Sequence, residues 1–291
     1  MAQTNLRVIV NPNSGTVSIN EKKGMVAALT RLAERHGFAT DVCYTERPGH
    51  ATELAAEAVR AGLGRVIAIG GDGTINETAK ALLHTRTALG IVPLGSGNGL
   101  ARHLGLPLPP HRAIERALAG RPVVIDSGQV NEHPFFCTTG IGFDAHVAHL
   151  FARQSVRGLV TYARLAFQAF LSYKPQEYRL DGEAQTLFAL TVANAGQFGN
   201  NAWIAPKANI ADGLLDVCRM QPFPKRDTGI ITWQLFNRKL DQSAYLQTTQ
   251  TRSATIQGEG PLAIHVDGEP VELPTDTMTV TVVPNSLLVI L

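Results

Sequence analysis

The chain has 291 residues, of which 44% are hydrophobic and 17% charged, with a formal net charge of +2. This length exceeds that of a usual single domain and predicts two domains with separate cores. No long block of like charge marks a nucleic-acid-binding tail, so nucleic acid is not an expected partner, whereas a nucleotide and a membrane surface both stay open.

The cysteines and the apolar runs indicate a cellular compartment. Cys43, Cys137 and Cys218 are scattered and odd in number, without the CxxC spacing of a zinc or redox site. The start MAQTNLRVIV leaves no room for a signal peptide, and no apolar run reaches the roughly 18 residues of a membrane-spanning helix. We therefore expect a cytoplasmic protein that does not cross a membrane.

The first part of the chain alternates short apolar runs with helical stretches. The pattern predicts strands at 6–10, 38–44, 65–69 and 89–92, and helices at 19–36, 51–61, 76–84, 99–104 and 111–118. Strands separated by helices predict right-handed crossovers and a mostly parallel sheet, in an α/β domain over residues 1–127. Ligands bind such sheets at the carboxyl ends of the strands.

The pattern changes after about residue 123. Strands are predicted at 123–125, 128–131, 135–139, 187–194, 214–220, 253–257, 262–266, 277–283 and 287–290. Their spacing predicts an antiparallel sandwich or barrel over 128–291, with helical insertions near 144–173 and 225–240. The last strand could belong to either domain.

Three glycine-containing loops follow three strands of the first part: NPNSG (11–15), GGDGT (70–74) and PLGSGNG (93–99). One such loop is as consistent with a structural turn as with a ligand site, but three at one sheet edge predict a site. Thr74 and Glu77 have the spacing of a capping box, which predicts a helix start there. Free N–H groups at a helix start favour a phosphate, and the glycines let it approach.

Asp72 lies among these glycines, and a carboxylate beside phosphates is repelled unless a cation lies between them. Magnesium would resolve the conflict, because it binds few carboxylates, keeps waters and bridges to phosphates. Nucleotide-dependent phosphoryl transfer is then the natural reaction class. The alternative is that Asp72 is a turn residue that bonds its own backbone. No GxxxxGK[ST] motif occurs, which excludes an ordinary P-loop.

Several segments, in chain order, resemble the diacylglycerol kinase catalytic-domain family, which includes bacterial lipid kinases and sphingosine kinases. They are NPNSG (11–15), Thr45 with GHATELA (49–55), GGDGTINE (70–77), PLGSGNGLARHLGLP (93–107), GIGFDA (140–145), ADGLLDV (211–217) and VDGE (266–269). GGDGT alone is shared with NAD kinases and phosphofructokinases. The resemblance implies a Rossmann-like three-layer α/β nucleotide-binding domain, a C-terminal antiparallel β-sandwich domain, and an active site in the cleft between them.

The resemblance also implies ATP and Mg²⁺, and it assigns residues to them. The residues that would bind ATP are Asn11, Pro12, Asn13, Ser14, Gly15, Thr45, Gly71, Asp72, Gly73, Thr74, Ile75, Asn76, Glu77, Ser96, Gly97 and Asn98. Mg²⁺ would lie near Asp72, which is also a catalytic candidate, and Asp126 would help to hold it.

Two further segments carry roles that the resemblance implies. A second, structural metal would use Asp212 with the carbonyls of Asn209 and Leu214, although an unmetallated turn fits the local sequence equally well. Asp267 and Glu269 fall where the family places its proton acceptor. Without the resemblance, DGE reads as an Asp-Gly hairpin turn.

The chain departs from the family pattern in places. The commoner form PLGTGND is PLGSGNG here, so Ser96 keeps a hydroxyl while Gly99 replaces an aspartate, as in sphingosine kinases. Asn200 and Asn201 replace glycines, with unknown effect. The acceptor could therefore be diacylglycerol, a sphingoid or a related membrane lipid.

Residues 145–176 contain no acidic residue, and their basic residues are Arg153, Arg157, Arg164 and Lys174. Such a helix can lie on an anionic membrane with its apolar side inserted, or pack on its own β domain with its arginines in water. Residues 225–240 are similar around Trp233 and Phe236. We expect peripheral association with the inner face of the membrane. A homodimer is also compatible with the sequence.

The predicted function is ATP- and Mg²⁺-dependent transfer of the γ-phosphate to a hydroxyl of a membrane lipid, as in phospholipid biosynthesis. Two alternatives stay open. One is a soluble-substrate kinase of the NAD-kinase type, which shares GGDGT but has no need of the basic, aromatic insertion. The other is a non-catalytic nucleotide- or lipid-binding regulator.

Overall fold

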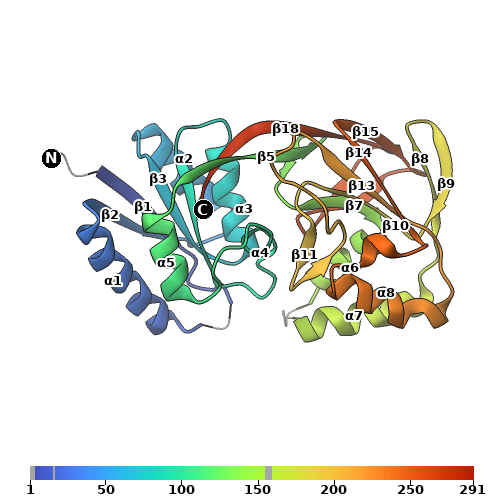
Figure 1. Cartoon of the computed structure of the whole chain (residues 1–291), viewed down its shortest axis with the longest axis horizontal. Coiled ribbons are helices and arrows are strands. Elements are labelled where there is room, and N and C mark those ends of the chain that lie inside the picture. Colours follow the sequence, from blue (N-terminus) through green and yellow to red (C-terminus); the bar gives the residue numbers. More distant parts are fainter. Residues whose placement is uncertain (1–3, 16, 155–158) are drawn as a thin grey trace. The chain divides into compact units, whose positions relative to one another are not determined.

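The computed structural model describes residues 4–15, 17–154 and 159–291, so the side chain of Arg157 lies outside it. The chain divides into two compact units. The first contains Met1–Ile125 and Asn285–Leu291, and the second contains Asp126–Pro284. The chain passes between the units in two strands, β5 (Pro122–Val130) and β18 (Thr277–Ile290) (Figure 1).

The first unit is built on a parallel sheet with the strand order β2-β1-β3-β4. Its strands are β1 (Thr4–Val10), β2 (Phe38–Tyr44), β3 (Arg65–Gly70) and β4 (Ala88–Pro93). Near the end of β18, Val289 pairs in parallel with Leu89 of β4 and extends this sheet. The order reverses at β1, because β2 and β3 lie on opposite sides of it. Ligands of α/β sheets bind beside such a reversal, at the carboxyl ends of the strands.

Helices cover both faces of this parallel sheet (Figure 1). Leu6, Val8 and Val10 of β1 pack in one core with α1 (Ile19–Arg35) and α5 (Pro110–Ala119). Alternate residues such as Ile9 are buried on the other face, where α2 (His50–Arg60) and α3 (Asp72–Leu82) pack together. Burial on both faces explains why these strands are almost continuously apolar. The short helix α4 (Gly99–His103) follows β4.

The second unit is an antiparallel β-sandwich. One sheet has the order β14-β13-β10-β7-β16-β17, and further strands pair around the first half of β18. The first sheet contains β14 (Leu246–Thr251), β13 (Leu215–Met220), β10 (Ala189–Ala193), β7 (Thr138–Gly142), β16 (Leu262–Val266) and β17 (Glu269–Leu273). The other strands are β15 (Ser253–Gln257), β8 (Gln176–Leu180), β9 (Glu183–Leu187) and β6 (His133–Phe135), beside β5.

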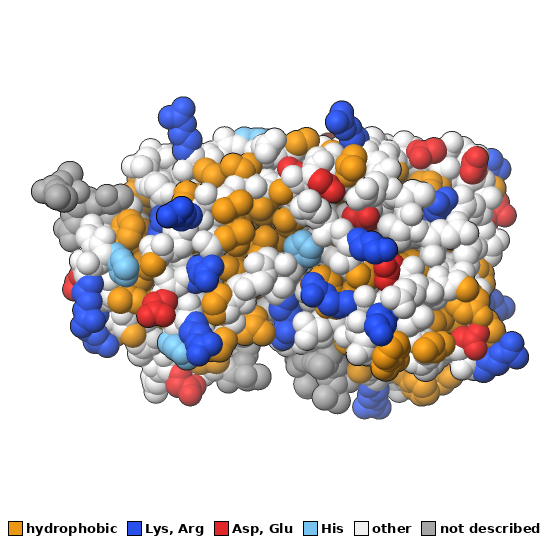
Figure 2. All heavy atoms as spheres, in the orientation of Figure 1, with side chains coloured by type: hydrophobic (Ala, Val, Ile, Leu, Met, Phe, Trp, Pro, Cys, Tyr) orange, Lys and Arg blue, Asp and Glu red, His pale blue; other side chains and the backbone are white. Residues whose placement is uncertain are grey.

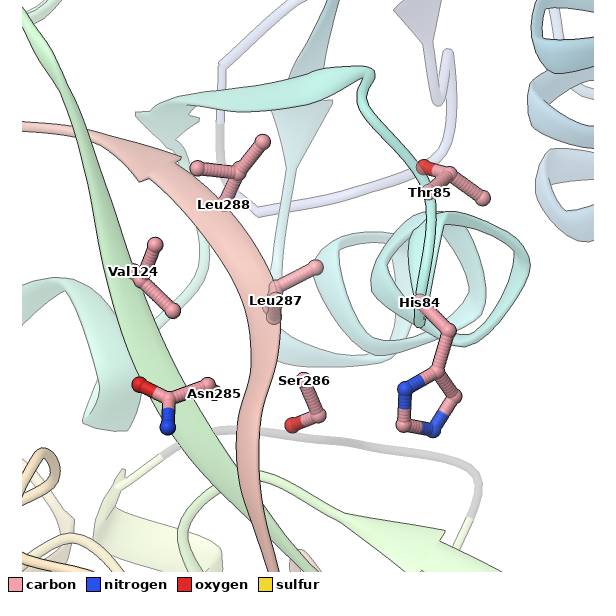
Figure 3. Close-up of a pocket in the computed structure, with 7 residues that line it drawn as sticks. All are labelled: His84, Thr85, Val124, Asn285, Ser286, Leu287 and Leu288. Carbon is pink, nitrogen blue, oxygen red and sulfur yellow. The ribbon is translucent and has the colours of Figure 1, made fainter.

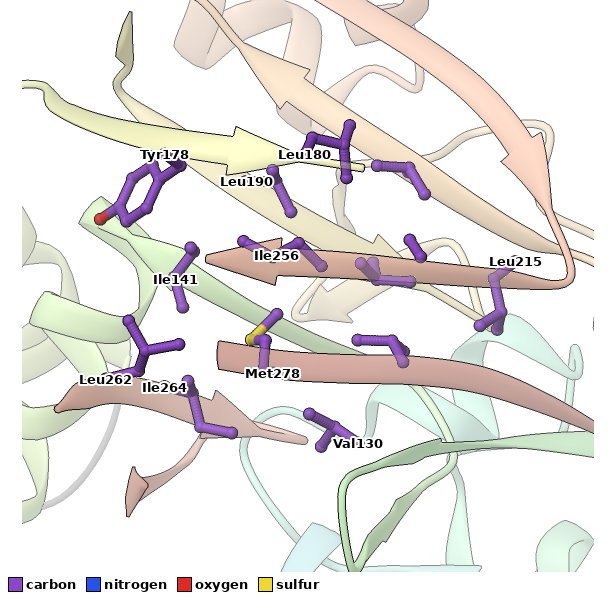
Figure 4. Close-up of a cluster of buried hydrophobic side chains, with 14 of the residues drawn as sticks. Val130, Ile141, Tyr178, Leu180, Leu190, Leu215, Ile256, Leu262, Ile264 and Met278 are labelled. Carbon is purple, nitrogen blue, oxygen red and sulfur yellow. The ribbon is translucent and has the colours of Figure 1, made fainter. Parts of the chain in front are cut away.

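Side chains from both layers form one buried core, which includes Ile141, Leu190 and Ile264 from the first sheet and Ile256 and Met278 from the other strands (Figure 4). This packing confirms the predicted sandwich. A separate short hairpin joins β11 (Gln197–Gly199) to β12 (Ala202–Trp203).

Helices cover the outer face of the six-stranded sheet. They are α6 (Phe143–Ala152), α7 (Leu159–Ser172) and α8 (Thr228–Phe236), with 3₁₀ turns η1 (Lys225–Asp227) and η2 (Leu240–Gln242). Ala189 and Ala193 of β10 face this helical layer, whereas Leu190 and Val192 face the sandwich core. The strand therefore buries alternate residues in two cores. Among the described residues, no helix is long and apolar enough to cross a membrane.

Several predicted strands differ from the observed ones. The predicted strand 187–194 is divided between β9 and β10, and 135–139 between β6 and β7. Conversely, the pairs 123–125 with 128–131 and 277–283 with 287–290 are the continuous strands β5 and β18. The strands β8, β14 and β17, and β9 apart from its last residue, were not predicted, because exposed polar residues dominate most of them.

A cavity of about 370 Å³ lies in the first unit (Figure 3). It is lined by His84, Thr85, Val124, Asn285, Ser286, Leu287 and Leu288. Its only titratable lining side chain is His84. None of the predicted catalytic, ATP-binding or metal-binding residues lines it, and we place the functional site elsewhere.

Candidate functional site

The three glycine loops of the first unit meet at the reversal of strand order. The backbone N–H of Asn11 donates to the carbonyl of Ile69 at 3.0 Å, and its amide Nδ2 donates to Thr74 Oγ1 at 2.9 Å. A Cβ on Gly15 would lie 1.9 Å from the carbonyl oxygen of Leu94. The first loop thus contacts both of the others.

Glycines also allow the second and third loops to touch. A Cβ on Gly95 would lie 2.8 Å from the Cα of Gly71, and a Cβ on Gly71 would lie 3.3 Å from the Cα of Gly95. At Gly73 a Cβ would meet nothing within 4 Å. Gly73 therefore keeps space open at the start of α3, which is the approach that a phosphate needs.

Asp72 ties the second loop to the third. Its Oδ2 accepts the N–H of Asn98 at 2.8 Å, and its Oδ1 accepts the N–H of Gly99 at 2.7 Å. The partners are backbone groups of another loop, so the alternative of a turn residue that bonds its own backbone is wrong. Each carboxylate oxygen has two acceptor sites, and one hydrogen bond to each oxygen leaves capacity for a further ligand.

The predicted capping box at Thr74 and Glu77 is wrong. Helix α3 begins at Asp72, so its N-cap is Gly71, three residues before the predicted cap Thr74, and Gly71 makes no side-chain hydrogen bond. Thr74 Oγ1 is used by Asn11, while the Glu77 carboxylate accepts the N–H groups of Gly49 at 2.8 Å and Ala51 at 3.2 Å. Glu77 therefore caps the neighbouring helix α2, and the start of α3 has no side-chain cap to compete with an anion.

Lys22 of α1 was missed by the sequence analysis. It is completely buried, and its Nζ donates to the carbonyls of Pro12 at 2.8 Å and Ser14 at 2.6 Å. Burial lowers the pKa of this ammonium group. Lys22 lies on the same buried face of α1 as Val26, Leu29 and Ala33. A lysine on an otherwise apolar helix face is the sequence pattern that could have predicted its role. Lys22 fixes the first loop and places a positive charge beneath it.

The remaining predicted ATP-binding residues differ in exposure. Thr45 follows β2, is buried, and donates its N–H to the carbonyl of Val10 at 2.9 Å. Ile75 is a core side chain, 1% exposed, and Ser96 is exposed. Buried Asn98 donates from Nδ2 to the carbonyl of Gly95 at 2.8 Å, but its Oδ1 has no partner among the described residues. This orphaned acceptor suits a donor group of a ligand.

In the second unit, Asp267 is the first residue of the turn between β16 and β17. Asp267 and Gly268 have φ values of +51° and +82°, so the predicted Asp-Gly hairpin turn is present. The carboxylate accepts N–H groups of Phe136 at 2.8 Å, Cys137 at 2.7 Å and Thr138 at 3.0 Å. Burial raises the pKa of the Asp267 carboxyl, and these three donors offset only part of that rise.

Glu269, the first residue of β17, differs from Asp267. It pairs with Val266 across the hairpin, and its side chain is exposed. Its carboxylate makes no hydrogen bond or ion pair with the part of the chain that the structure describes. Glu269 is therefore able to approach a substrate hydroxyl, whereas the oxygens of Asp267 are already used by the backbone.

Asp126 lies at the start of the second unit and is 2% exposed. Its Oδ2 accepts the N–H of Gly213 at 2.7 Å, which joins it to the predicted second metal segment. Asn194 Nδ2 donates to the carbonyls of Asp126 at 3.1 Å and Phe136 at 2.9 Å. One network thus joins Asp126 to the segment that holds Asp267.

The predicted second metal residues lie in backbone-bonded turns. Asn209 Oδ1 accepts the N–H of Ala211 at 3.2 Å, and Asp212 Oδ1 accepts the N–H of Leu214 at 3.0 Å. Among the described residues, no group of three or more His, Cys, Asp or Glu side chains could hold a metal ion. Magnesium needs no such group, since it is commonly held by one or two carboxylates together with water and substrate phosphates. The Asp72 carboxylate, whose two oxygens each accept one backbone N–H, fits that chemistry.

A separate polar cavity of about 480 Å³ lies beside β13 and β14. It is lined by Asp216, Thr248 and Gln250, and also by Asp241, which pairs with Lys207 at 2.9 Å. Burial, with a smaller contribution from Asp212, raises the pKa of Asp216 to about 6. None of the predicted catalytic or ATP-binding residues lines this cavity.

Comparison with known proteins agrees with the division of the chain into two units. The family model described as "Diacylglycerol kinase catalytic domain" matches residues 5–130, and that described as "YegS C-terminal NAD kinase beta sandwich-like domain" matches residues 137–291. A "Probable lipid kinase YegS-like" protein of Chromohalobacter salexigens is 35% identical over 254 residues, 84% of this chain and 81% of the relative. A Pseudomonas putida protein of the same name is 32% identical over 81% of this chain and 80% of its own length.

A solved structure titled as a diacylglycerol kinase from Bacillus anthracis str. Sterne has the same fold. It aligns with a TM-score of 0.74 at 19% identity, over 100% of this chain and 97% of that one. The matched family models and the relatives confirm the resemblance that the motifs carry. The chain therefore belongs to the diacylglycerol kinase catalytic-domain family, and it is a kinase.

Proposed function

We propose that the protein transfers the γ-phosphate of ATP to a hydroxyl group of a membrane lipid. The observation that carries this proposal is the meeting of three glycine loops at the uncapped start of α3. Such a site offers backbone N–H groups and a helix dipole to phosphates. The YegS-like relatives are named as lipid kinases, which supports a lipid as the acceptor.

The phosphates of ATP would lie over the three glycine loops of the first unit. Gly73 leaves room for phosphate oxygens, and Lys22 contributes a positive charge beneath the first loop. The unpartnered Asn98 Oδ1 would accept from a donor group of the nucleotide, such as a hydroxyl, and not from the phosphates. Mg²⁺ would neutralise phosphate charge, and Asp72 is its proposed ligand. Asp126 is proposed, on the family resemblance, as a residue that helps to hold such an ion. The turn from Asn209 to Leu214 is the proposed place of a second, structural ion.

Glu269 is the proposed proton acceptor for the lipid hydroxyl, and Asp267 the residue that holds the turn. A base must reach the proton it abstracts. The exposed Glu269 carboxylate meets that condition, while Asp267 is engaged by three backbone N–H groups. Removal of the hydroxyl proton makes a poor nucleophile able to attack the γ-phosphorus.

Helices α7 and α8 form the proposed membrane-facing surface, which is defined by five exposed side chains. These are Phe167, Leu171, Ile230, Trp233 and Phe236, with exposed fractions of 63%, 53%, 52%, 49% and 44%. Lys225 Nζ donates to the carbonyl of Leu171 at 3.1 Å and links the start of the α8 region to α7. Helix α8 is mostly apolar, yet Ile231 is its only buried residue. Exposed apolar side chains that lie together are typical of a contact surface.

The charges around this surface favour an anionic membrane. Neither α7 nor α8 contains an acidic residue. Asp227, just before α8, is hydrogen-bonded to Tyr245 Oη at 2.5 Å. Basic residues within α7 or close to the ends of α7 and α8 are Arg164, Lys174, Lys225, Arg226, Arg238 and Lys239. Orange and blue side chains lie side by side at the lower right of Figure 2, where Figure 1 draws α7 and α8. Each cation near an anionic bilayer contributes about 1 kcal/mol.

Vesicle sedimentation tests the surface. The protein should pellet with phosphatidylglycerol vesicles more than with phosphatidylcholine vesicles. Phe167→Glu and Trp233→Glu should reduce pelleting, because each puts a charge into the apolar layer. Ile19→Glu, at a 40% exposed apolar residue of the first unit, is the matched control and should pellet normally. Equal pelleting of all variants would refute the surface.

Transfer of labelled γ-phosphate tests the reaction. Mg-ATP is offered with diacylglycerol, sphingosine, ceramide and phosphatidylglycerol in anionic vesicles, and with NAD in a parallel tube. Label in one lipid supports the proposal and identifies the acceptor. Label in NAD would instead establish a soluble-substrate kinase, and ATP binding without transfer to any acceptor would favour a regulator.

A further inference from the structure

A buried histidine lies beneath the Asp267–Gly268 turn. His265 of β16 is 2% exposed. Its Nε2 lies 3.1 Å from Asp144 Oδ2, and its Nδ1 accepts the backbone N–H of Gly268 at 3.4 Å. A carboxylate only accepts, so Nε2 carries the hydrogen that bonds to Asp144. The neutral ring then leaves Nδ1 as an acceptor aimed at the turn.

Asp144, in the first turn of α6, is itself held firmly. Its Oδ1 accepts the N–H of Ala145 at 2.8 Å, and its Oδ2 also accepts from Thr191 Oγ1 at 2.6 Å. A Cβ on Gly140 would lie 2.7 Å from this oxygen, and Gly142, at φ +97°, turns the chain from β7 into α6. The spacing of GIGFDA therefore serves to place this carboxylate against the sheet.

The two residues of the turn are restrained from different sides. Asp267 is held through its carboxylate by backbone N–H groups of residues 136–138, which end at the first residue of β7. Gly268 is exposed, and a Cβ there would meet nothing within 4 Å, so no packing fixes it. The bond from its N–H to His265 restrains the Asp267–Gly268 peptide, one residue before Glu269.

We propose that His265 and Asp144 form a positioning pair, which fixes the Gly268 peptide and thereby aims the Glu269 carboxylate at the acceptor hydroxyl. The inference rests on the proposed function of Glu269. Neither residue touches substrate in this role. A doubly protonated His265 would turn Nδ1 into a donor facing the Gly268 N–H, so only the neutral ring positions the turn.

Steady-state kinetics with Mg-ATP and the lipid acceptor separate positioning from general stability. His265→Leu should lower kcat by about tenfold or more, because small misplacements of a catalytic group are costly. The KM for ATP should stay unchanged, since the ATP-binding loops lie in the first unit. His265→Asn, whose Oδ1 lies close to the position of Nδ1, should recover most of the loss. Asp144→Asn should fall between them.

A double-mutant cycle tests whether the pair acts through Glu269. In a Glu269→Gln background, His265→Leu should lower kcat no further, because the group to be aimed is already absent. Additive losses would overturn the proposal, as would a wild-type kcat in His265→Leu or a failure of His265→Asn to rescue it.

Amide hydrogen exchange tests the contact without any activity. The amides of Gly268 and Glu269 should exchange faster in folded His265→Leu than in the wild type, and at the wild-type rate in His265→Asn. Unchanged exchange in His265→Leu would overturn the pair even in an active enzyme. Faster exchange in a protein that phosphorylates no lipid would keep the contact and refute the proposed function instead.

Discussion

At the scale of single residues, the acidic side chains of the motifs serve the backbone as well as chemistry. Asp72 accepts two backbone N–H groups, Asp267 accepts three, and Glu77 accepts two. Glu269 alone among these four is exposed and unpaired among the described residues. The sequence motifs predicted which carboxylates belong to the candidate sites. The motifs could not predict which carboxylates are bound by backbone N–H groups and which one is left exposed. That depends on N–H groups that are distant in sequence, such as those of residues 136–138.

Glu269→Gln should lower kcat by about 10²- to 10⁴-fold, the usual contribution of a general base. The melting temperature should stay at the wild-type value, since the side chain is exposed and unpaired. The phosphate-transfer assay and thermal unfolding measure the two effects. Glu272→Gln changes another exposed glutamate of the same strand and should leave kcat unchanged. Equal activity of the two variants would exclude Glu269 as the base.

Asp267→Asn should lower stability as well as activity. An amide NH₂ cannot accept, so at least one of the three N–H groups loses its partner, at a cost of about 1–3 kcal/mol.

The raised pKa of Asp267 means that the native state binds its proton more readily than the unfolded chain. Its contribution to stability is therefore largest at acid pH and falls as pH rises through the folded-state pKa. Urea unfolding of both proteins across pH measures this, and a pH-independent difference between them would contradict it.

At the scale of elements, the sequence was most informative where burial is regular. Helices α1, α2 and α5 lie within about one residue of their predicted bounds, because their apolar stripes repeat with the helical period. The start of α3 was misplaced, because Thr74 and Glu77 are used by Asn11 and by α2. Strand β14, with one buried residue in six, carries no alternation to detect.

Lys22→Met should weaken the first loop, because the carbonyls of Pro12 and Ser14 both lose their donor. We expect a loss of about 1–3 kcal/mol in the free energy of unfolding, and a raised KM for ATP with little change in kcat. The neighbouring Lys23 is exposed on the same helix, so Lys23→Met is a matched control. A KM for ATP that is the same in both variants would show that Lys22 does not organise the loop.

At the scale of the whole molecule, the first unit is not a continuous piece of chain. Leu287, Val289 and Ile290 are each at most 1% exposed, and Val289 pairs with β4. The backbones of Arg121 and Leu291 also exchange hydrogen bonds, of 3.0 Å and 2.9 Å. In the sequence, Pro284 and Asn285 suggested that one strand ends and another begins. Strand β18 nevertheless continues through them, because its neighbour changes from β15 to β4.

Removal of residues 286–291 should therefore destabilise the first unit although residues 1–125 remain. Each lost apolar side chain contributes about 1.5–3 kcal/mol, and three of them approach the whole stability of about 5–15 kcal/mol of a typical domain. We expect rapid amide exchange in β4 and loss of ATP binding. Leu288→Ala removes a side chain that is only half-buried and should leave both unchanged. Native exchange in β4 of the shortened chain would mean that the first unit folds without β18, and that this strand serves the second unit alone.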